Sequence, residues 1–245
     1  MSANLPETDM HQPAVAGRFY PADQAELRRD IVSYLKPGAA DGASAEVRRN
    51  LGLMLPHAGY VFSGAVAGLT LAQSALMPPP DIFPALTSGD KPGYGSEHTF
   101  VILGPSHTGR GAPLSVWPRG AWRSPLGDAL VDADFAAGLL DAPGSAYQGN
   151  HNAHFGDHAI EVIVPFLQLI APSGKIVPIT VSLYEPEGLR RAGEILGGQI
   201  AAGPKSGRQD VIVTSSDLNH FLPHEANMRQ DALVLDRPRA LEPAR

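Results

Sequence analysis

Residues 100–107, Phe-Val-Ile-Leu-Gly-Pro-Ser-His, place four apolar side chains in a row directly before a turn that carries a histidine. Residues 51–59 (LGLMLPHAG) likewise end in a turn with a histidine, and residues 210–217 (DVIVTSSD) and 175–183 (KIVPITVSL) form further apolar runs. Such runs are typical of strands buried on both faces, and helix-length segments separate them along the chain. The sequence therefore predicts an α/β fold with a mainly parallel central sheet and helices on both faces.

The segments between these runs carry the signals expected of helices and loops. Leu27, Ile31 and Leu35 fall on one face of a helix that ends at Pro37-Gly38. Further helices are expected over residues 63–76, 132–140, 157–170, 186–200 and 223–235. Residues 114–131 predict a β-hairpin outside the main sheet, and residues 1–12 a flexible N-terminal arm. Residues 13–245 are expected to form a single domain.

Composition limits the classes of function. The 245 residues are 43% hydrophobic and 18% charged, which predicts a globular protein, and the net charge of −6 argues against a nucleic-acid partner. No apolar run reaches the ~20 residues of a membrane span, and the start lacks a signal-peptide pattern, so we expect a cytoplasmic protein without a membrane partner. Cysteine is absent, so any transition metal must be held by His, Asp or Glu.

Three histidines follow the predicted strands. His57 and His107 lie in the turns after two of the apolar runs, and His220 lies three residues after Asp217, in the turn after a third. Ligands of open parallel sheets collect outside the carboxyl ends of the strands, where neutral imidazoles can bind Fe, Zn or Cu. Asp217 and His220 can also form an acid/base pair. The alternative is that each imidazole only caps its turn.

A second polar cluster opens the predicted helix over residues 157–170. His158 and Glu161 are three residues apart and would share a helix face, where they can bind a metal or move a proton. The alternative is an N-terminal Glu favoured by the helix dipole, next to a surface His. His151 and His154 precede this helix in a loop, where solvated side chains are expected.

Several other mechanisms lack their sequence motifs. There is no GxGxxG after a strand and no GxxxxGK[ST], so no cradle for nucleotide phosphates is expected. The chain also lacks the GxSxG of serine hydrolases and the HExxH of zinc proteases.

Five segments in order resemble a known family. They are residues 15–21 (VAGRFYP), 56–60 (PHAGY), 104–107 (GPSH), 157–162 (DHAIEV) with 165–167 (PFL), and 215–220 (SSDLNH). Together they are similar to the Memo family, whose microbial members are also called AmmeMemoRadiSam system protein B. The resemblance covers residues 12–236.

This resemblance implies a fold similar to the class III extradiol ring-cleaving dioxygenases, which hold Fe(II) with two His and a Glu. His57 and His107 match the two His ligands of Memo relatives. Asp217 and His220 match residues that line the same pocket. His158 and Glu161 match a further segment at the cleft, EHS-x-E.

The sequence departs from this pattern in two places. Asp157 and Ala159 stand where the family usually has Glu and Ser. Family members also carry a Cys-Gly segment near the C-terminus, whose Cys supplies a third metal ligand, whereas this chain ends at Arg245 without any Cys. Either the chain is a shortened form, or Glu161, His158 or His220 completes the coordination.

The sequence thus supports two main hypotheses and one weaker one. The first is an enzyme with a mononuclear divalent metal, Fe(II) or else Cu or Zn, that carries out O₂-dependent or redox chemistry on a small organic substrate. His220 or His158 would then be the acid/base. The second is a non-catalytic module that binds a metal or a peptide in the same cleft. The third is a metal-dependent hydrolase. The family resemblance also implies a functional link to a radical-SAM protein.

Overall fold

The central layer of the protein is a six-stranded mixed sheet. The computed structural model describes residues 7–35, 52–78, 83–88, 98–202 and 209–240. The strands follow the order β2 (Gly52–Leu55), β9 (Gln209–Ser215), β3 (His98–Pro105), β8 (Lys175–Val181), β4 (Leu114–Val116) and β7 (Gln148–Gly149). β2, β9, β3 and β8 pair in parallel, and β4 runs antiparallel to β8. The α/β prediction is confirmed, and the prediction of a parallel sheet holds for these four strands.

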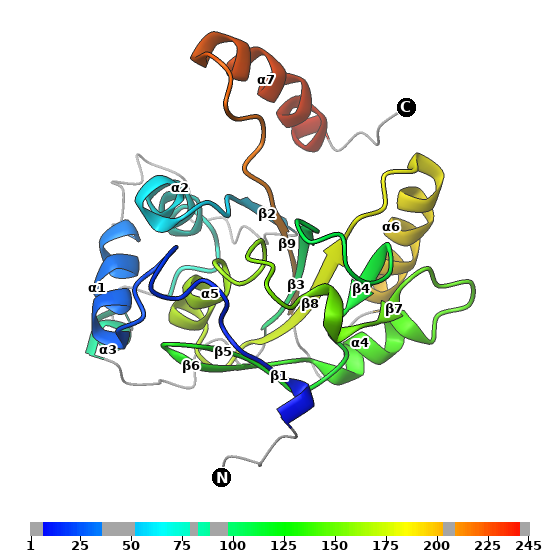
Figure 1. Cartoon of the computed structure of the whole chain (residues 1–245), viewed down its shortest axis with the longest axis horizontal. Helices are drawn as coiled ribbons and strands as arrows, with labels where there is room; N and C mark the ends of the chain where they lie inside the picture. The colour runs from blue at the N-terminus through cyan, green and yellow to red at the C-terminus, as the bar shows by residue number, and fades with distance from the viewer. Residues whose placement is uncertain (1–6, 36–51, 79–82, 89–97, 203–208, 241–245) are drawn as a thin grey trace.

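Helices cover both faces of this sheet, as predicted (Figure 1). On one face, Phe100 and Ile102 of β3 belong to a core that includes α1 (Gln24–Tyr34), α2 (Tyr60–Ala72) and α5 (Val164–Ile170). On the other face, Val101 packs in a core with α4 (Ala133–Leu140) and α6 (Pro186–Ala201). Alternate side chains of one strand therefore enter opposite cores, because successive residues of a strand point to opposite faces.

A smaller sheet corrects two of the predictions. β5 (Ala121–Ser124) and β6 (Gly127–Leu130) form the expected hairpin, but β4 pairs with β8 in the main sheet. At the N-terminus, the 3₁₀ helix η1 (Glu7–Asp9) leads into β1 (Met10–His11), which pairs in parallel with β5. The flexible arm expected over residues 1–12 is therefore wrong for residues 7–12, and residues 1–6 lie outside the described part.

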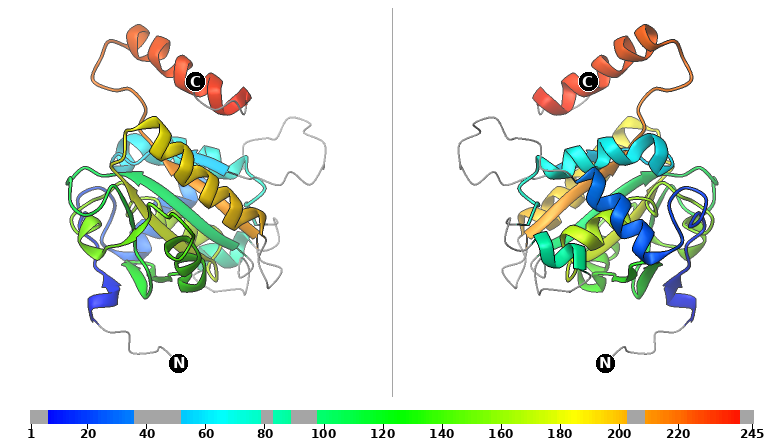
Figure 2. Two further views of the ribbon diagram at one scale, coloured as in Figure 1. Left: turned by 90° about the vertical axis from the view of Figure 1, so that its right-hand side faces the viewer. Right: turned by 90° about the vertical axis from the view of Figure 1, so that its left-hand side faces the viewer.

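The remaining helices differ in how closely they pack. The short helix α3 (Phe83–Ser88) lies next to α1, whereas α7 (His224–Ala240) stands away from the two layers (Figure 2). The helix predicted over residues 157–170 begins only at α5; residues 159–163 are turns, and Asp157 and His158 belong to no helix or strand. Within the described ranges, no helix combines the length and the apolar character needed to cross a bilayer.

Helix α2 approaches α1 closely because it carries glycine at the crossing. A Cβ atom on Gly68 would lie 2.5 Å from the carbonyl group of Tyr34. We expect Gly68→Ala to lower the free energy of unfolding by about 1–3 kcal/mol, because the backbone of α1 would have to move. Gly193 in α6 has nothing within 4 Å of such an atom, so Gly193→Ala is expected to raise stability by about 0.5–1 kcal/mol. Urea unfolding of both variants measures this, and equal effects would contradict the close approach.

Candidate metal centre

The carboxyl ends of three adjacent strands, β2, β9 and β3, converge on one site. His57, Asp217 and His107 each lie two residues after the end of their strand. The ring centroids of His57 and His107 are 5.2 Å apart, and His158, from the turns before α5, lies 5.8 Å from His57 and 4.4 Å from His107. Of the three histidines predicted to meet at strand ends, His57 and His107 lie side by side, whereas His220 does not join them; the third ring beside them is that of His158, which follows no strand.

The hydrogen bonds of His57 fix its tautomer. Ser215 Oγ donates to the carbonyl oxygen of Ala159 at 2.5 Å, and this uses its single proton. The 2.6 Å contact between Ser215 Oγ and His57 Nδ1 must then be a hydrogen bond that Nδ1 donates. The lone pair of His57 is therefore on Nε2. Burial, more than the neighbouring imidazoles, lowers the pKa of His57 to about 4, so the ring is neutral at pH 7.

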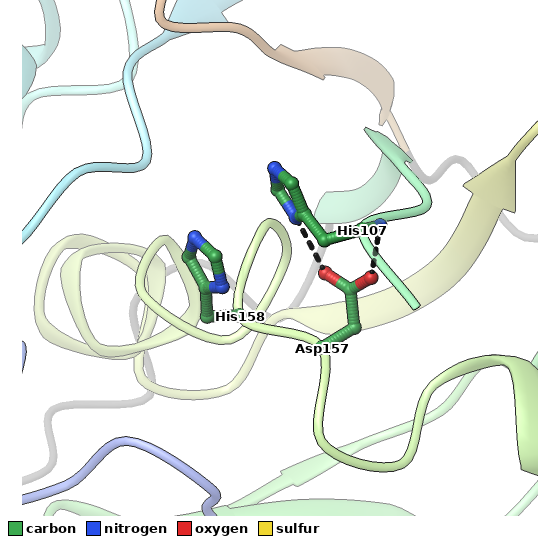
Figure 3. Close-up of side chains that lie close together, drawn as sticks. All are labelled: His107, Asp157 and His158. Carbon is green, nitrogen blue, oxygen red and sulfur yellow. Dashed lines mark hydrogen bonds and ion pairs between the residues drawn. The ribbon is translucent and has the colours of Figure 1, made fainter. Parts of the chain in front are cut away.

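Asp157 orients His107 in the same manner (Figure 3). Its carboxylate accepts hydrogen bonds from the backbone N–H of His107 at 2.6 Å and of Ala159 at 3.0 Å, and it lies 3.1 Å from His107 Nδ1. Burial alone would raise the pKa of Asp157, but these hydrogen bonds lower it below its ordinary value. An ionised carboxylate requires a donor at Nδ1, so the lone pair of His107 is also on Nε2.

The ring planes decide which imidazoles can share an ion. Donor atoms of His107, Asp157 and His158 lie within 4.8 Å of one another, close enough for a metal. The rings of His107 and His158, however, are stacked, with planes only 10° apart (Figure 3). A metal lies roughly in the plane of an imidazole that binds it, so these two rings cannot both bind one ion as they stand. The planes of His57 and His107 cross at 75° and allow a shared ion.

Asp217 supplies the carboxylate next to His57. Its Oδ1 accepts from the backbone N–H groups of His57 at 2.6 Å and Ala58 at 3.1 Å, which holds the turn after β2 against the end of β9. Its Oδ2 lies 3.8 Å from His57 Nε2. Asp217 thus places one carboxylate oxygen beside the Nε2 atom of His57, and imidazole and carboxylate donors of this kind suit Fe(II), Cu or Zn.

The structure turns Glu161 away from the imidazoles. Its buried carboxylate accepts hydrogen bonds from Tyr20 Oη at 2.6 Å and from the backbone N–H groups of Ala14 at 2.8 Å and Val15 at 3.0 Å. Because residues 157–163 are not helical, Glu161 and His158 do not share a helix face, which corrects that prediction. Glu161 holds the N-terminal segment against the domain, and this segment carries Phe19 to within 4.6 Å of the ring of His158.

Removing the charge of Glu161 is expected to destabilise the protein. In Glu161→Gln, an amide NH₂ would face backbone N–H donors that now meet a carboxylate oxygen. We expect the free energy of unfolding to fall by about 2–4 kcal/mol, because buried hydrogen bonds to a charged group are lost. Glu187, an exposed carboxylate that pairs with Arg190 on α6, provides the control, and Glu187→Gln should change stability little. Similar urea midpoints for the two variants would contradict this role.

His220 lies apart from the other predicted site residues. Its exposed ring contacts Phe221 at 4.5 Å, and Nδ1 lies 3.1 Å from the carbonyl oxygen of Leu218. It lines the same pocket as His158 and Asp217 without a described contact to His57 or His107. Sequence reasoning missed Ser215 and Tyr20, although Ser215 opens the SSD motif and Tyr20 ends the run Ala-Gly-Arg-Phe-Tyr.

Fold and site together define an α/β protein whose parallel strands deliver imidazoles and carboxylates to one end of the sheet, where they can hold a metal. The profile of the family described as Memo-like protein matches residues 11–244. The chain belongs to this Memo-like family, so the resemblance inferred from its motifs is confirmed. This family has a dioxygenase-like fold, as expected.

Curated relatives agree with this assignment. A MEMO1 family protein of Desulfurococcus amylolyticus is 34% identical over 231 residues, covering 92% of this chain and 74% of the relative. MEMO1 family proteins of Methanopyrus kandleri and Ignicoccus hospitalis are 35% and 36% identical over 240 residues. These matches cover 95% and 94% of this chain and 76% of each relative.

Proposed function

We propose that the protein is a metal-dependent oxidoreductase that holds one Fe(II) ion with His57 and His107 and acts on a small organic substrate. The observation that carries this proposal is the geometry of these rings: each presents a lone pair on Nε2, their centroids are 5.2 Å apart, and their planes cross at 75°. Asp217 is the carboxylate next to His57, so we assign it as the third ligand.

Two imidazoles and one carboxylate favour Fe(II) over the alternatives Cu and Zn. This set leaves coordination positions open, as in non-haem iron oxygenases, and the bound ion would supply redox chemistry with O₂. His158 lies beside the pair and lines the pocket, so we assign it the transfer of a proton to or from the substrate. His220, on the same pocket, is the second candidate for that role. The cytoplasmic location and the link to a radical-SAM protein rest on the sequence and its family resemblance.

Anaerobic loading with Fe(II) tests this function. We expect one iron per chain after desalting, measured with a chromogenic chelator, and O₂ uptake when air and a small phenolic substrate are added. One iron without O₂ uptake for any substrate would favour the alternative, a non-catalytic module that binds a metal or a peptide. Iron well below one per chain, with no binding of Zn(II) or Cu(II), would overturn the metal site itself.

The hydrogen bond of Ser215 should affect metal affinity more than stability. Without its hydroxyl, the proton of His57 is no longer held on Nδ1, so Ser215→Ala is expected to weaken Co(II) binding about 10–100-fold. Ser124 is also buried and donates to Gln168 Oε1 at 2.5 Å, so Ser124→Ala matches the loss of a buried hydroxyl outside the site. Optical titration with Co(II) measures both variants, and equal affinities would show that Ser215 does not orient His57.

A further inference from the structure

An apolar pocket adjoins the imidazole cluster. It has a volume of about 870 Å³, within the range of small-molecule sites. Its apolar lining comes from the N-terminal segment, β2, α2, the segment that leads to α7, and α7 itself: Phe19, Met54, Phe62, Val66, Phe221 and Leu235. Phe62 and Phe221 are 82% and 95% exposed, so a ligand in this pocket would remove large aromatic surfaces from water.

The described side chains that line the pocket include no Lys or Arg to pair with an anionic ligand. His158 and Asp217 mark the end that faces the metal centre, and His220 and two serines add further polar atoms. A phosphate or carboxylate placed among these side chains, away from the metal, would lose its hydration without a cationic side chain to pair with.

The wall after β9 contains unusual backbone conformations. Leu218 and Phe221 have φ angles of 58° and 70°, and they are the non-glycine residues with positive φ in the described part of the chain. Both line the pocket. Apolar residues rarely adopt this conformation, and such residues concentrate at binding and active sites. The strain falls where side chains from this segment would contact a ligand.

We propose that this pocket binds an uncharged, mainly apolar small molecule, with its polar group directed at His158 and Asp217. The inference rests on the proposed function, because the ligand would be the substrate of the same metal centre. It adds the class of substrate, which follows from the apolar lining and from the lack of cationic side chains among its described residues. A ligand that carries a phosphate or carboxylate in the part remote from the metal is disfavoured, because the described lining offers no cation there.

Two fluorescent probes that differ by a single charged group test this class. N-phenyl-1-naphthylamine is uncharged, and 8-anilinonaphthalene-1-sulfonate is the same ring system with a sulfonate. We expect the metal-free wild-type protein to bind one molecule of the uncharged probe at least about tenfold more tightly than the anionic one. Equal affinities, or binding of neither probe, would overturn the inference.

Variants that add one cation show whether the preference arises in the pocket. Val66 on α2 is 56% exposed and lines the pocket, so Val66→Arg should lower the preference for the uncharged probe at least about tenfold. Leu189 on α6 is 41% exposed and is not among the lining residues, so Leu189→Arg should leave it within about twofold. The same shift in both variants would assign the preference to net charge and overturn the proposal.

Metal titration of the same samples separates this proposal from the metal centre. If the protein binds one iron per chain but shows no preference between the probes, only the proposed ligand class is overturned. A probe preference in a protein that binds no metal overturns the proposed function and leaves the pocket as a binding site. Circular dichroism checks that each arginine variant is folded.

Discussion

Replacing His57 and His107 together with alanine is expected to abolish stoichiometric metal binding and to weaken affinity by more than about 100-fold. Loss of one residue that merely orients a ligand already costs about 10–100-fold, and this variant removes both nitrogens that face the site. Anaerobic titration with Fe(II), or with Co(II) as an optical probe, measures the effect.

The matched control removes two other histidines, of which His220 lines the pocket. His220 and His224 are exposed, and the double variant with alanine at both positions should keep wild-type affinity. Because His57 is buried, the single variant His107→Ala provides a second test with less risk to folding, since its side chain is 41% exposed. Unchanged affinity in a folded His107→Ala protein would disprove the assigned ligands.

The sheet could be predicted because its strands leave a strong local signal. The runs that became β3 and β9 are continuously apolar, as burial between two helical layers requires. β4 was wrongly placed outside the main sheet because its three residues pair antiparallel with β8, a contact that no local pattern encodes. The helix expected from residue 157 begins at Val164. Before it, the carboxylate of Asp157 accepts a hydrogen bond from His107, and the carbonyl oxygen of Ala159 accepts one from Ser215.

The positions of His57 and His107 could be predicted because they follow strand ends, whereas the position of Glu161 depends on tertiary packing. The turns after β2 and β3 place His57 and His107 at one edge of the sheet, as the topology of parallel strands dictates. The position of Glu161 could not be predicted, because it depends on contacts with Val15 and Tyr20, about 140 residues earlier in the chain. The sequence contains both partners but no signal that joins them.

Sequence reasoning also missed a buried cluster of aromatic rings around His11 of strand β1. His11 stacks on Trp122 at 3.8 Å and lies 5.4 Å from Trp117, and His154, expected to be solvated, is 1% exposed and lies 5.7 Å from Trp117. His11 Nδ1 and His154 Nε2 are buried without a hydrogen-bond partner among the described residues. Protonation would place a charge in surroundings that cannot solvate it.

This cluster makes stability depend on pH. Burial lowers the pKa of His11 to about 4 and that of His154 to about 3, whereas both titrate near 6.5 in the unfolded chain. Between pH 6.5 and 4 the unfolded state therefore binds more protons than the folded state. The free energy of unfolding should be fully retained above pH 6.5 and fall as the pH decreases, by up to about 1.4 kcal/mol per pH unit for each imidazole.

Urea unfolding of metal-free protein between pH 7 and 4.5 tests this dependence, because carboxylates with lowered pKa values, such as Asp157, contribute only at lower pH. His57 adds to the slope with the same sign, so a variant must isolate the cluster. His11→Phe retains the stack on Trp122 and removes one site of proton uptake, so its slope should be smaller by about 1.4 kcal/mol per pH unit. His224→Gln on exposed α7 should retain the wild-type slope. A slope unchanged in His11→Phe would mean that His11 is protonated as easily in the folded protein as in the unfolded chain, which its complete burial against two indole rings does not permit.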